Sequence, residues 1–377
     1  MGSAIRLEGS RFPPKRRVRI RLGGRQVDSL RTDRNGRFAT RLTVPSPTAG
    51  RRLVRVKLRS RALSFSFMVT APGATAEATL TPDVTPAGIP DPVIAAAGDI
   101  ACDPASSSFR SGAGTSSRCR QKHTSDLLVN AGLAAVLALG DIQYECAADS
   151  AFARAYDPSW GRLKAMTRPA LGNHEYRTSG GSGCDTSGNA RGYFRYFGAA
   201  AGDPGRGYYS YDLGAWHLIA LNSNCSRVSC SSSSTQVRWL RQDLAAHPTR
   251  CTLAYWHHAR FTSGTNSPGS SSVKPLYQAL YDHGADVLLV GHDHHYERFA
   301  PQNPSGARDV GRGIREFVVG TGGKGFHPIH TVQPNSEVRN NVTFGVLELT
   351  LRPTSYDWQF VPEAGKTFRD AGSQACH

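Results

Sequence analysis

The chain has 377 residues, 39% of them hydrophobic, and a formal net charge of +16. This length allows two domains with buried cores, and the sequence has no uncharged apolar run of about 18 residues, the length that a membrane-spanning helix needs. The first ten residues, MGSAIRLEGS, lack the basic and then apolar pattern of a secretory signal. We therefore expect either a cytosolic protein or a mature chain whose leader is not present.

Most of the positive charge lies in residues 1–70, which hold 18 Lys and Arg residues and only three acidic ones. Stretches such as RVRIRLGG, GRFATRLTV and RLVRVKLRS place apolar residues at every second position, with Arg or Lys between them. This alternation predicts half-buried antiparallel strands. We predict a small all-β sandwich with a basic outer face, which resembles the immunoglobulin-like modules of many secreted bacterial proteins.

Residues 71–92 are rich in Ala, Thr and Pro and have no apolar periodicity, which predicts a semi-extended linker. From residue 93 to 377 the pattern changes to short apolar runs that end in polar clusters. The runs predict buried strands. The stretches between them that place apolar residues three to four positions apart predict helices. This second domain is predicted to be α/β, with mixed sheets covered by helices. The predicted strands are residues 93–99, 134–141, 168–175, 251–258 and 286–294, and the predicted helices are 122–132, 234–247 and 273–285.

The eight cysteines form no C-x-x-C pair. An even number scattered through loops favours disulfides over a zinc site or a redox motif. We predict an oxidising compartment, so that the protein is secreted or extracytoplasmic. Cys225 and Cys230 form the shortest loop to close, and the other pairings stay open.

The predicted strands of the second domain end, one after another, in residues that can bind metals. These residues are Asp99, Asp141, Asn173, His257 and the pair His292 and His294. In α/β folds such strand ends converge on one site. Mixed Asp, Asn and His ligands suit two adjacent cations bridged by one Asp, which can hold a hydroxide and bind a phosphoryl group. The pattern therefore predicts phosphoester hydrolysis.

Five short blocks, in this order, resemble the calcineurin-like metallophosphoesterases over roughly residues 93–361. They are GD (98–99), GDIQY (140–144), GNHE (172–175), WHH (256–258) and GHDH (291–294). The resemblance implies a four-layer αββα sandwich. Most of that superfamily has D-x-H in the first block, whereas this chain has Asp99-Ile100-Ala101. Tyr144, three residues after Asp141, and YERF at 296–299 resemble the purple acid phosphatases instead.

Carried over to this chain, the resemblance implies two metal ions. Fe(III) would be held by Asp99, Asp141, Tyr144 and His294, because a phenolate in place of an imidazole favours a trivalent metal. A second, divalent ion, Zn, Fe or Mn, would be held by Asp141, Asn173, His257 and His292. His174 would face the substrate as a phosphate ligand or as the proton donor to the leaving oxygen.

Four neighbours of these residues are weaker candidates. Glu175 is expected to support the ligands from behind. His258 is either a contact of the substrate or the ligands, or a structural hydrogen-bonding group. Asp293 and His295 alternate away from His292 and His294 on an extended backbone, so we expect Asp293 not to be a ligand and rank His295 low. GTGGKG at 320–325 lacks the context of a P-loop, and we expect a turn after a strand.

The predicted function is an acid phosphatase-like phosphomonoesterase that acts on a small phosphorylated substrate. One alternative is a phosphodiesterase or nucleotide hydrolase with the same centre. A further alternative makes the basic residues 1–70 the main functional part, as a binder of a polyanion such as a cell-wall polymer or nucleic acid.

Overall fold

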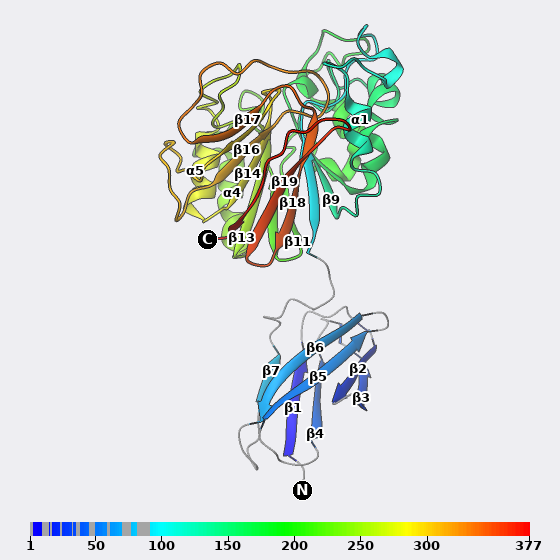
Figure 1. The fold of residues 1–377 in the computed structure, drawn as a ribbon, viewed down its shortest axis with the longest axis vertical. Coiled ribbons are helices and arrows are strands. Elements are labelled where there is room, and N and C mark those ends of the chain that lie inside the picture. The colour runs from blue at the N-terminus through cyan, green and yellow to red at the C-terminus, as the bar shows by residue number, and fades with distance from the viewer. Residues whose placement is uncertain are drawn as a thin grey trace. The chain divides into compact units, whose positions relative to one another are not determined.

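The protein divides into two compact units, Met1–Pro90 and Asp91–His377 (Figure 1). The computed structural model describes all of the second unit but only parts of the first. The described residues are 3–9, 15, 17–22, 25–31, 33–34, 38–44, 50–58, 61–69, 77–80 and 91–377.

The first unit contains two sheets of β-strands, of which β2, β4, β5 and β6 lie at stretches with the alternating pattern. One sheet has the order β4-β1-β7 and the other β3-β2-β5-β6. The strands are β1 (Ser3–Gly9), β2 (Arg17–Leu22), β3 (Arg25–Arg31), β4 (Phe38–Val44), β5 (Gly50–Leu58), β6 (Arg61–Val69) and β7 (Glu77–Leu80). Strand β7 lies within the segment predicted as a linker and pairs in parallel with β1. Most side chains of this unit, and with them the predicted basic face, lie outside the described residues.

The second unit is built around two mixed sheets. The six-stranded sheet has the order β10-β9-β8-β18-β19-β20, with β8 to β10 parallel and the rest antiparallel. Its strands are β8 (Val93–Ala97), β9 (Ala135–Leu139), β10 (Thr167–Ala170), β18 (Gly345–Arg352), β19 (Ser355–Pro362) and β20 (Ala371–Ala375). The β8 to β10 strands begin within a residue of the predicted positions and end earlier.

The seven-stranded sheet has the order β11-β12-β13-β14-β16-β15-β17, and its four strands β12, β13, β14 and β16 run parallel. The strands are β11 (Tyr209–Leu213), β12 (Trp216–Ala220), β13 (Cys251–His258), β14 (Val287–Gly291), β15 (Tyr296–Phe299), β16 (Arg315–Val319) and β17 (Ser336–Asn340).

The alternation along β13 shows how the layers pack. Leu253 and Tyr255 enter a core that also contains side chains of the six-stranded sheet. Ala254 and Trp256 face the other way, into a core shared with the apolar faces of helices α4 (Thr235–Ala246) and α5 (Lys274–Asp282). In Figure 1 these helices flank the seven-stranded sheet, and α1 (Gln121–Asp126) lies on the opposite side of the unit near β9. The mixed α/β fold with two sheets agrees with the predicted sandwich.

The helices follow local sequence signals. Helix α4 is capped by Ser234, whose side chain accepts a hydrogen bond from Val237 N at 3.2 Å, and α5 has Pro275 in its first turn. The helix predicted over 122–132 is wrong beyond Asp126, because the backbone at Asn130 and Gly132 has positive φ values of 63° and 71°. The remaining helical segments are short. They are α2 (Asp149–Ala151), α3 (Arg191–Phe197), a π-helical turn at Phe152–Tyr156, and 3₁₀ turns at Arg110–Gly112, Trp160–Met166, His174–Tyr176 and Gly198–Ala201.

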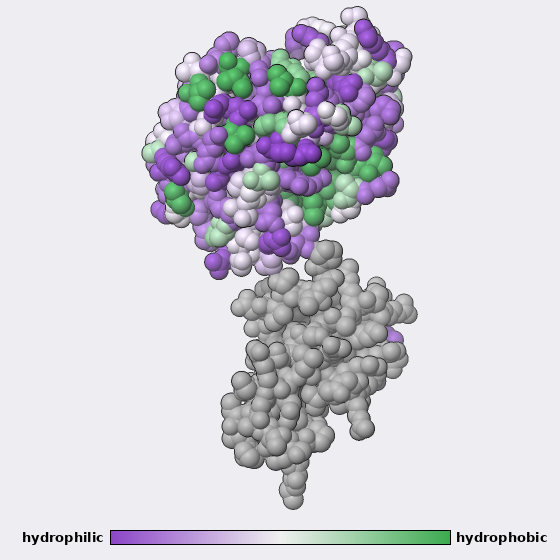
Figure 2. Space-filling model, viewed as in Figure 1, coloured by the Kyte–Doolittle hydropathy of each residue, from purple (hydrophilic) through white to green (hydrophobic). Residues whose placement is uncertain are grey.

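All eight cysteines are paired, which confirms the predicted disulfides. Cys225 bonds Cys230 as expected. The other three bonds are Cys102–Cys119, Cys146–Cys184 and Cys251–Cys376. Among the described helices none has the length and apolarity needed to cross a bilayer. On the visible face of the second unit, apolar residues are scattered among hydrophilic ones (Figure 2).

Candidate metal centre

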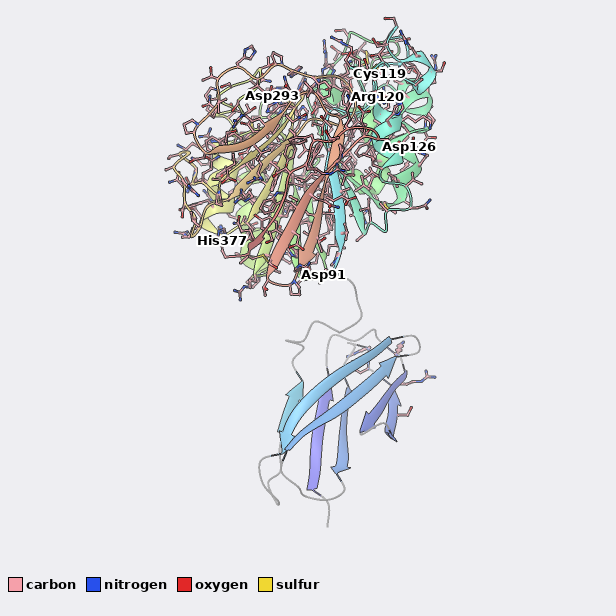
Figure 3. The ribbon with its side chains drawn as sticks, in the orientation of Figure 1. Asp91, Cys119, Arg120, Asp126, Asp293 and His377 are labelled. Atoms are coloured by element: carbon pink, nitrogen blue, oxygen red, sulfur yellow. A yellow bond between two sulfur atoms is a disulfide. The ribbon has the colours of Figure 1, made fainter. Side chains whose placement is uncertain are left out.

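The predicted metal-binding residues meet at one end of the second unit. Asp99 N donates to Gly140 O at 3.1 Å, and Gly98 N donates to Val319 O at 2.9 Å, so the loops that follow strands of both sheets are joined there. Figure 3 shows Asp293, in the loop after β14, at the end of the unit opposite to Asp91 and His377. The strand ends therefore converge as the α/β pattern predicts.

One group of donor atoms surrounds the Tyr144 hydroxyl. This oxygen lies 2.9 Å from Asp99 Oδ1, 3.1 Å from Asp141 Oδ2 and 3.0 Å from His294 Nε2. His294 Nε2 is also 3.2 Å from Asp99 Oδ1. The four residues assigned by resemblance to the first metal are thus brought together.

A second group surrounds His257 Nε2. This nitrogen lies 3.1 Å from Asn173 Oδ1, 3.1 Å from His292 Nδ1 and 3.3 Å from Asp141 Oδ1. The ligand atoms of Asp141, His257 and His292 all lie within 4.8 Å of one another, so these three residues could hold a metal ion. Asp141 belongs to both groups, with one carboxylate oxygen in each. Carboxylate, imidazole, amide and phenol donors together suit hard and borderline cations.

The electrostatics of the buried donors also fit cation binding. Burial alone would raise the pKa of Asp141, but the nearby His257 charge outweighs it and holds this pKa well below the ordinary value. Burial lowers the pKa of His257, yet the Asp141 carboxylate raises it to about 9. Burial and the charges of Asp141 and Asp99 raise the pKa of Tyr144 well above its usual range. Protons on Tyr144 and His257 thus balance the carboxylates, and a cation can replace them.

Glu175 lies behind this centre. Its buried carboxylate accepts hydrogen bonds from the backbone N–H groups of Asp141 (2.9 Å), Ile142 (2.9 Å) and Gly172 (2.7 Å). Burial and the nearby Asp141 charge raise its pKa to about 7. Glu175 therefore joins the loop after β9 to the loop after β10 and positions Asp141.

His174 borders the centre and reaches solvent. Its backbone N donates to Asp141 Oδ1 at 2.8 Å, and its Nδ1 lies 2.7 Å from Glu145 O. The ring lies 4.2 Å from the Tyr144 ring between centroids, and Nε2 is 3.8 Å from Asp141 Oδ2. A substrate bound at the centre would meet this side chain.

The other candidate residues occupy different positions. His258 Nδ1 lies 2.8 Å from Ser223 Oγ, which suits a structural hydrogen bond. The His258 ring also lies 4.4 Å from the His292 ring, which suits a contact with the ligands. His295 is buried against Glu297, 3.0 Å from Nε2 to Oε2, and joins neither group. Asp293 accepts a hydrogen bond from Thr262 Oγ1 at 2.7 Å, away from both groups.

Three side chains at the site lie outside the five sequence blocks that resemble the metallophosphoesterases. Lys324 Nζ lies 4.1 Å from the centre of the Tyr144 ring and pairs with Glu145. Arg177 Nη1 lies 3.3 Å from His174 Nε2. The His327 ring stacks on the His294 ring at 3.8 Å. Lys324 belongs to GTGGKG, which follows β16 without forming a helix, as expected for a turn.

A second group of histidines and acids, His217, Asp243 and His247, lies apart from this centre. The two His217 nitrogens are each 2.8 Å from a carboxylate oxygen, one of Asp212 and one of Asp243. The His217 and His247 rings stack 4.4 Å apart at an angle of 11°, and one ligand atom of each of His217, Asp243 and His247 lies within 4.8 Å of the others. Burial lowers the pKa of His217, but hydrogen bonds to Asp243 and Asp212 outweigh it and raise this pKa. These contacts favour a protonated, ion-paired His217.

Residues 94–296 match the model of the calcineurin-like phosphoesterase family. Human acid phosphatase type 7 is 29% identical over 222 residues, which are 50% of this chain and 48% of that protein. Purple acid phosphatase 15 of Arabidopsis thaliana is 30% identical over 96 residues, 24% of this chain and 18% of that protein. The chain thus matches less than half the length of either relative.

Two solved structures have a similar fold. Purple acid phosphatase PPD1 from yellow lupin (Lupinus luteus) seeds matches 96% of this chain and 69% of its own, with a TM-score of 0.58 and 14% identity. GAP50, described as the anchor in the inner membrane complex of Plasmodium, matches 77% of this chain and 90% of its own, with a TM-score of 0.50 and 14% identity. Because one neighbour is a phosphatase and the other an anchor, function must be argued from the site.

Proposed function

Because the chain belongs to the calcineurin-like phosphoesterase family, we propose that it is a metal-dependent phosphoester hydrolase that acts on phosphomonoesters through a dinuclear centre. The observation that carries this proposal is the shared position of Asp141. Its Oδ2 lies 3.1 Å from the Tyr144 hydroxyl and its Oδ1 lies 3.3 Å from His257 Nε2, so one carboxylate can bridge two ions.

The residues divide between the two ions as follows. Asp99, Tyr144 and His294, together with Asp141, would hold Fe(III). Asn173, His257 and His292, together with Asp141, would hold Zn, Fe or Mn(II). When bound, such ions withdraw charge from the phosphoryl oxygens and lower the pKa of water.

The chain itself would orient the substrate and supply a proton. His174 is fixed at Nδ1 by the Glu145 carbonyl at 2.7 Å, and its Nε2 lies on the side of Asp141, 3.3 Å from Arg177 Nη1. Nε2 would contact the phosphate or donate a proton to the leaving oxygen. Arg177 and His258 border the same region from different loops.

Replacing the bridging carboxylate tests the proposal. We expect Asp141→Asn to abolish phosphatase activity and to lower the bound metal, measured by elemental analysis, without unfolding the protein. His292→Ala should do the same. Asp282→Asn, on the surface of α5, is the matched control and should keep both activity and metal. Activity that survives in either site variant would contradict the dinuclear centre.

The same centre would also serve a phosphodiesterase or nucleotide hydrolase. Comparing the hydrolysis of a simple monoester and a simple diester decides between these functions. We also propose an oxidising, extracytoplasmic location, which the four disulfides support.

A further inference from the structure

Three charged side chains form a cluster on the solvent side of His174, which we call the rim cluster: Glu145, Arg177 and Lys324. Glu145 pairs with Lys324, and its Oε2 lies 3.7 Å from Arg177 Nη1. Arg177 Nη1 is also 3.3 Å from His174 Nε2. The cluster therefore lies one side chain away from Asp141, on the side from which a substrate would approach His174.

The rim cluster is placed by the elements that build the centre. Lys324 N donates to Asp99 O at 2.9 Å, so the loop after β16 carries this lysine to the centre. Glu145 directly follows Tyr144, and Arg177 ends the short turn that begins at His174. Two basic groups from separate loops thus face one acid beside the candidate site.

The exposure of these groups argues against a purely structural ion pair. The side chains of Arg177, Glu145 and Lys324 are 45%, 27% and 18% exposed. Partly exposed pairs of this kind contribute little to stability. With two cations and one anion, the cluster keeps a net positive charge and can accept a further oxyanion.

We propose that Arg177 and Lys324 form a second anion subsite, which binds an acidic group on the leaving part of the substrate, and that Glu145 competes with this group. The inference rests on the proposed function and names its substrate class: phosphomonoesters and phosphoanhydrides that carry a second phosphate or a carboxylate close to the scissile bond. In the absence of substrate, Glu145 pairs with both Arg177 and Lys324. The oxyanion of the substrate displaces the Glu145 carboxylate from these two side chains.

The test compares kcat/KM for three substrates. p-Nitrophenyl phosphate has no acidic group on its leaving part, pyrophosphate carries a second phosphate, and phosphoglycolate carries a carboxylate. We expect Arg177→Gln and Lys324→Met to lower the ratio of the acidic substrates to p-nitrophenyl phosphate by about tenfold, since each removes a charged hydrogen bond. Glu145→Gln should raise the same ratio, because it releases both cations while its backbone carbonyl still holds His174.

Arg195→Gln is the matched control, because Arg195 is an exposed arginine on α3 that pairs with Asp149. It should leave both ratios unchanged. An effect on pyrophosphate but not on phosphoglycolate would limit the subsite to phosphate. Ratios unchanged in both Arg177→Gln and Lys324→Met, or lowered in Glu145→Gln, would overturn the subsite.

These results are separable from a failure of the proposed function. A folded wild-type protein that hydrolyses none of the three substrates would refute the hydrolase, not the subsite. Calorimetric binding of pyrophosphate relative to orthophosphate then tests the subsite directly. Weaker selective binding of pyrophosphate in Arg177→Gln and Lys324→Met supports it, and unchanged binding excludes it.

Discussion

Three residues of the centre, Asp99, Asp141 and His292, have positive φ values of 61°, 48° and 71°. This conformation is uncommon for residues with a Cβ and costs about 1–3 kcal/mol each. Each of them follows the end of a strand, where an extended backbone would continue the alternation of the sheet. The left-handed turn instead directs the side chains of three strands toward one point. Strained backbone at these positions is what a site selected for chemistry would retain.

Tyr144→Phe tests the assignment of this residue to an iron ligand. The ring should stay packed against His174 and Lys324, because only the hydroxyl is removed. We expect the purified wild-type protein to show a visible tyrosinate-to-Fe(III) absorption band and the variant to lack it. Tyr156→Phe, which removes a buried hydroxyl without a hydrogen-bond partner, should keep the band. A colourless, active wild type with only divalent metal would refute the assignment of Tyr144 to an Fe(III) site and leave the fold assignment intact.

His217 gives a prediction for the dependence of stability on pH. Its carboxylate partners raise its pKa above the ordinary 6.5 in the folded state. Its stabilisation is therefore fully present below pH 6.5 and is lost as the pH rises through the folded pKa. We expect His217→Gln to lower the free energy of unfolding by about 1–2 kcal/mol at pH 6 and by less at higher pH. Urea denaturation across this range measures it, with His123→Gln as control; a loss independent of pH would contradict a charged His217.

At the scale of elements, the loops after β9 and β10 approach each other through glycines. A Cβ on Gly172 would lie 2.2 Å from both Asp141 N and Asp141 Oδ1, and one on Gly140 would lie 2.7 Å from Gly172 N. These two positions therefore cannot carry a side chain if Asp141 is to lie between the two donor groups. The motifs GDIQY and GNHE each contain the glycine that permits this contact.

We expect Gly172→Ala to displace Asp141 and to cause the loss of bound metal and of activity. The added methyl would meet the backbone N–H of Asp141, which donates to Glu175, and the Asp141 carboxylate, which accepts from His174 N, and neither group can move freely. Elemental analysis and a phosphatase assay measure the effect. Gly311→Ala is the control, because its nearest contact would be 3.9 Å away at Asp309. A fully metallated Gly172→Ala protein would show that the close approach is not needed.

The elements also show what the sequence could predict. Apolar runs that end in Asp or His located β8, β9, β13 and β14, because parallel strands buried on both faces have a strong signal. Strands β17 and β20 were not predicted, because their residues are mostly exposed or half-buried and lack such runs. Lys324 and His327 could not be placed at the site, since their contacts with Glu145 and His294 join loops far apart in the sequence, whereas Arg177 lies only three residues after His174 but in no motif. Only the motif residues carry a local signal.

At the scale of the whole molecule, the disulfides differ in what they constrain. Cys251–Cys376 spans 125 residues and ties the C-terminus to β13, the strand that ends at His257 and His258. Cys225–Cys230 spans only 5 residues, in the loop whose Ser223 Oγ accepts from His257 N at 3.2 Å and from His258 N at 2.9 Å. The first bond therefore closes a loop of about a third of the chain, whereas the second constrains the loop that contacts His257 and His258.

Removing the Cys251–Cys376 bond should affect stability more than activity, and removing the Cys225–Cys230 bond should affect activity more than stability. From loop-closure entropy, the double change Cys251→Ala with Cys376→Ala should lower stability by about 5 kcal/mol, and Cys225→Ala with Cys230→Ala by about 2 kcal/mol. Activity should follow the reverse order, because only the shorter loop holds Ser223 against the two histidines. Thermal denaturation and kcat/KM at a temperature where both variants remain folded measure the two effects. If both variants lose stability and activity in equal proportion, the long disulfide and the site loop belong to one cooperative unit, and the division of roles inferred from their positions is wrong.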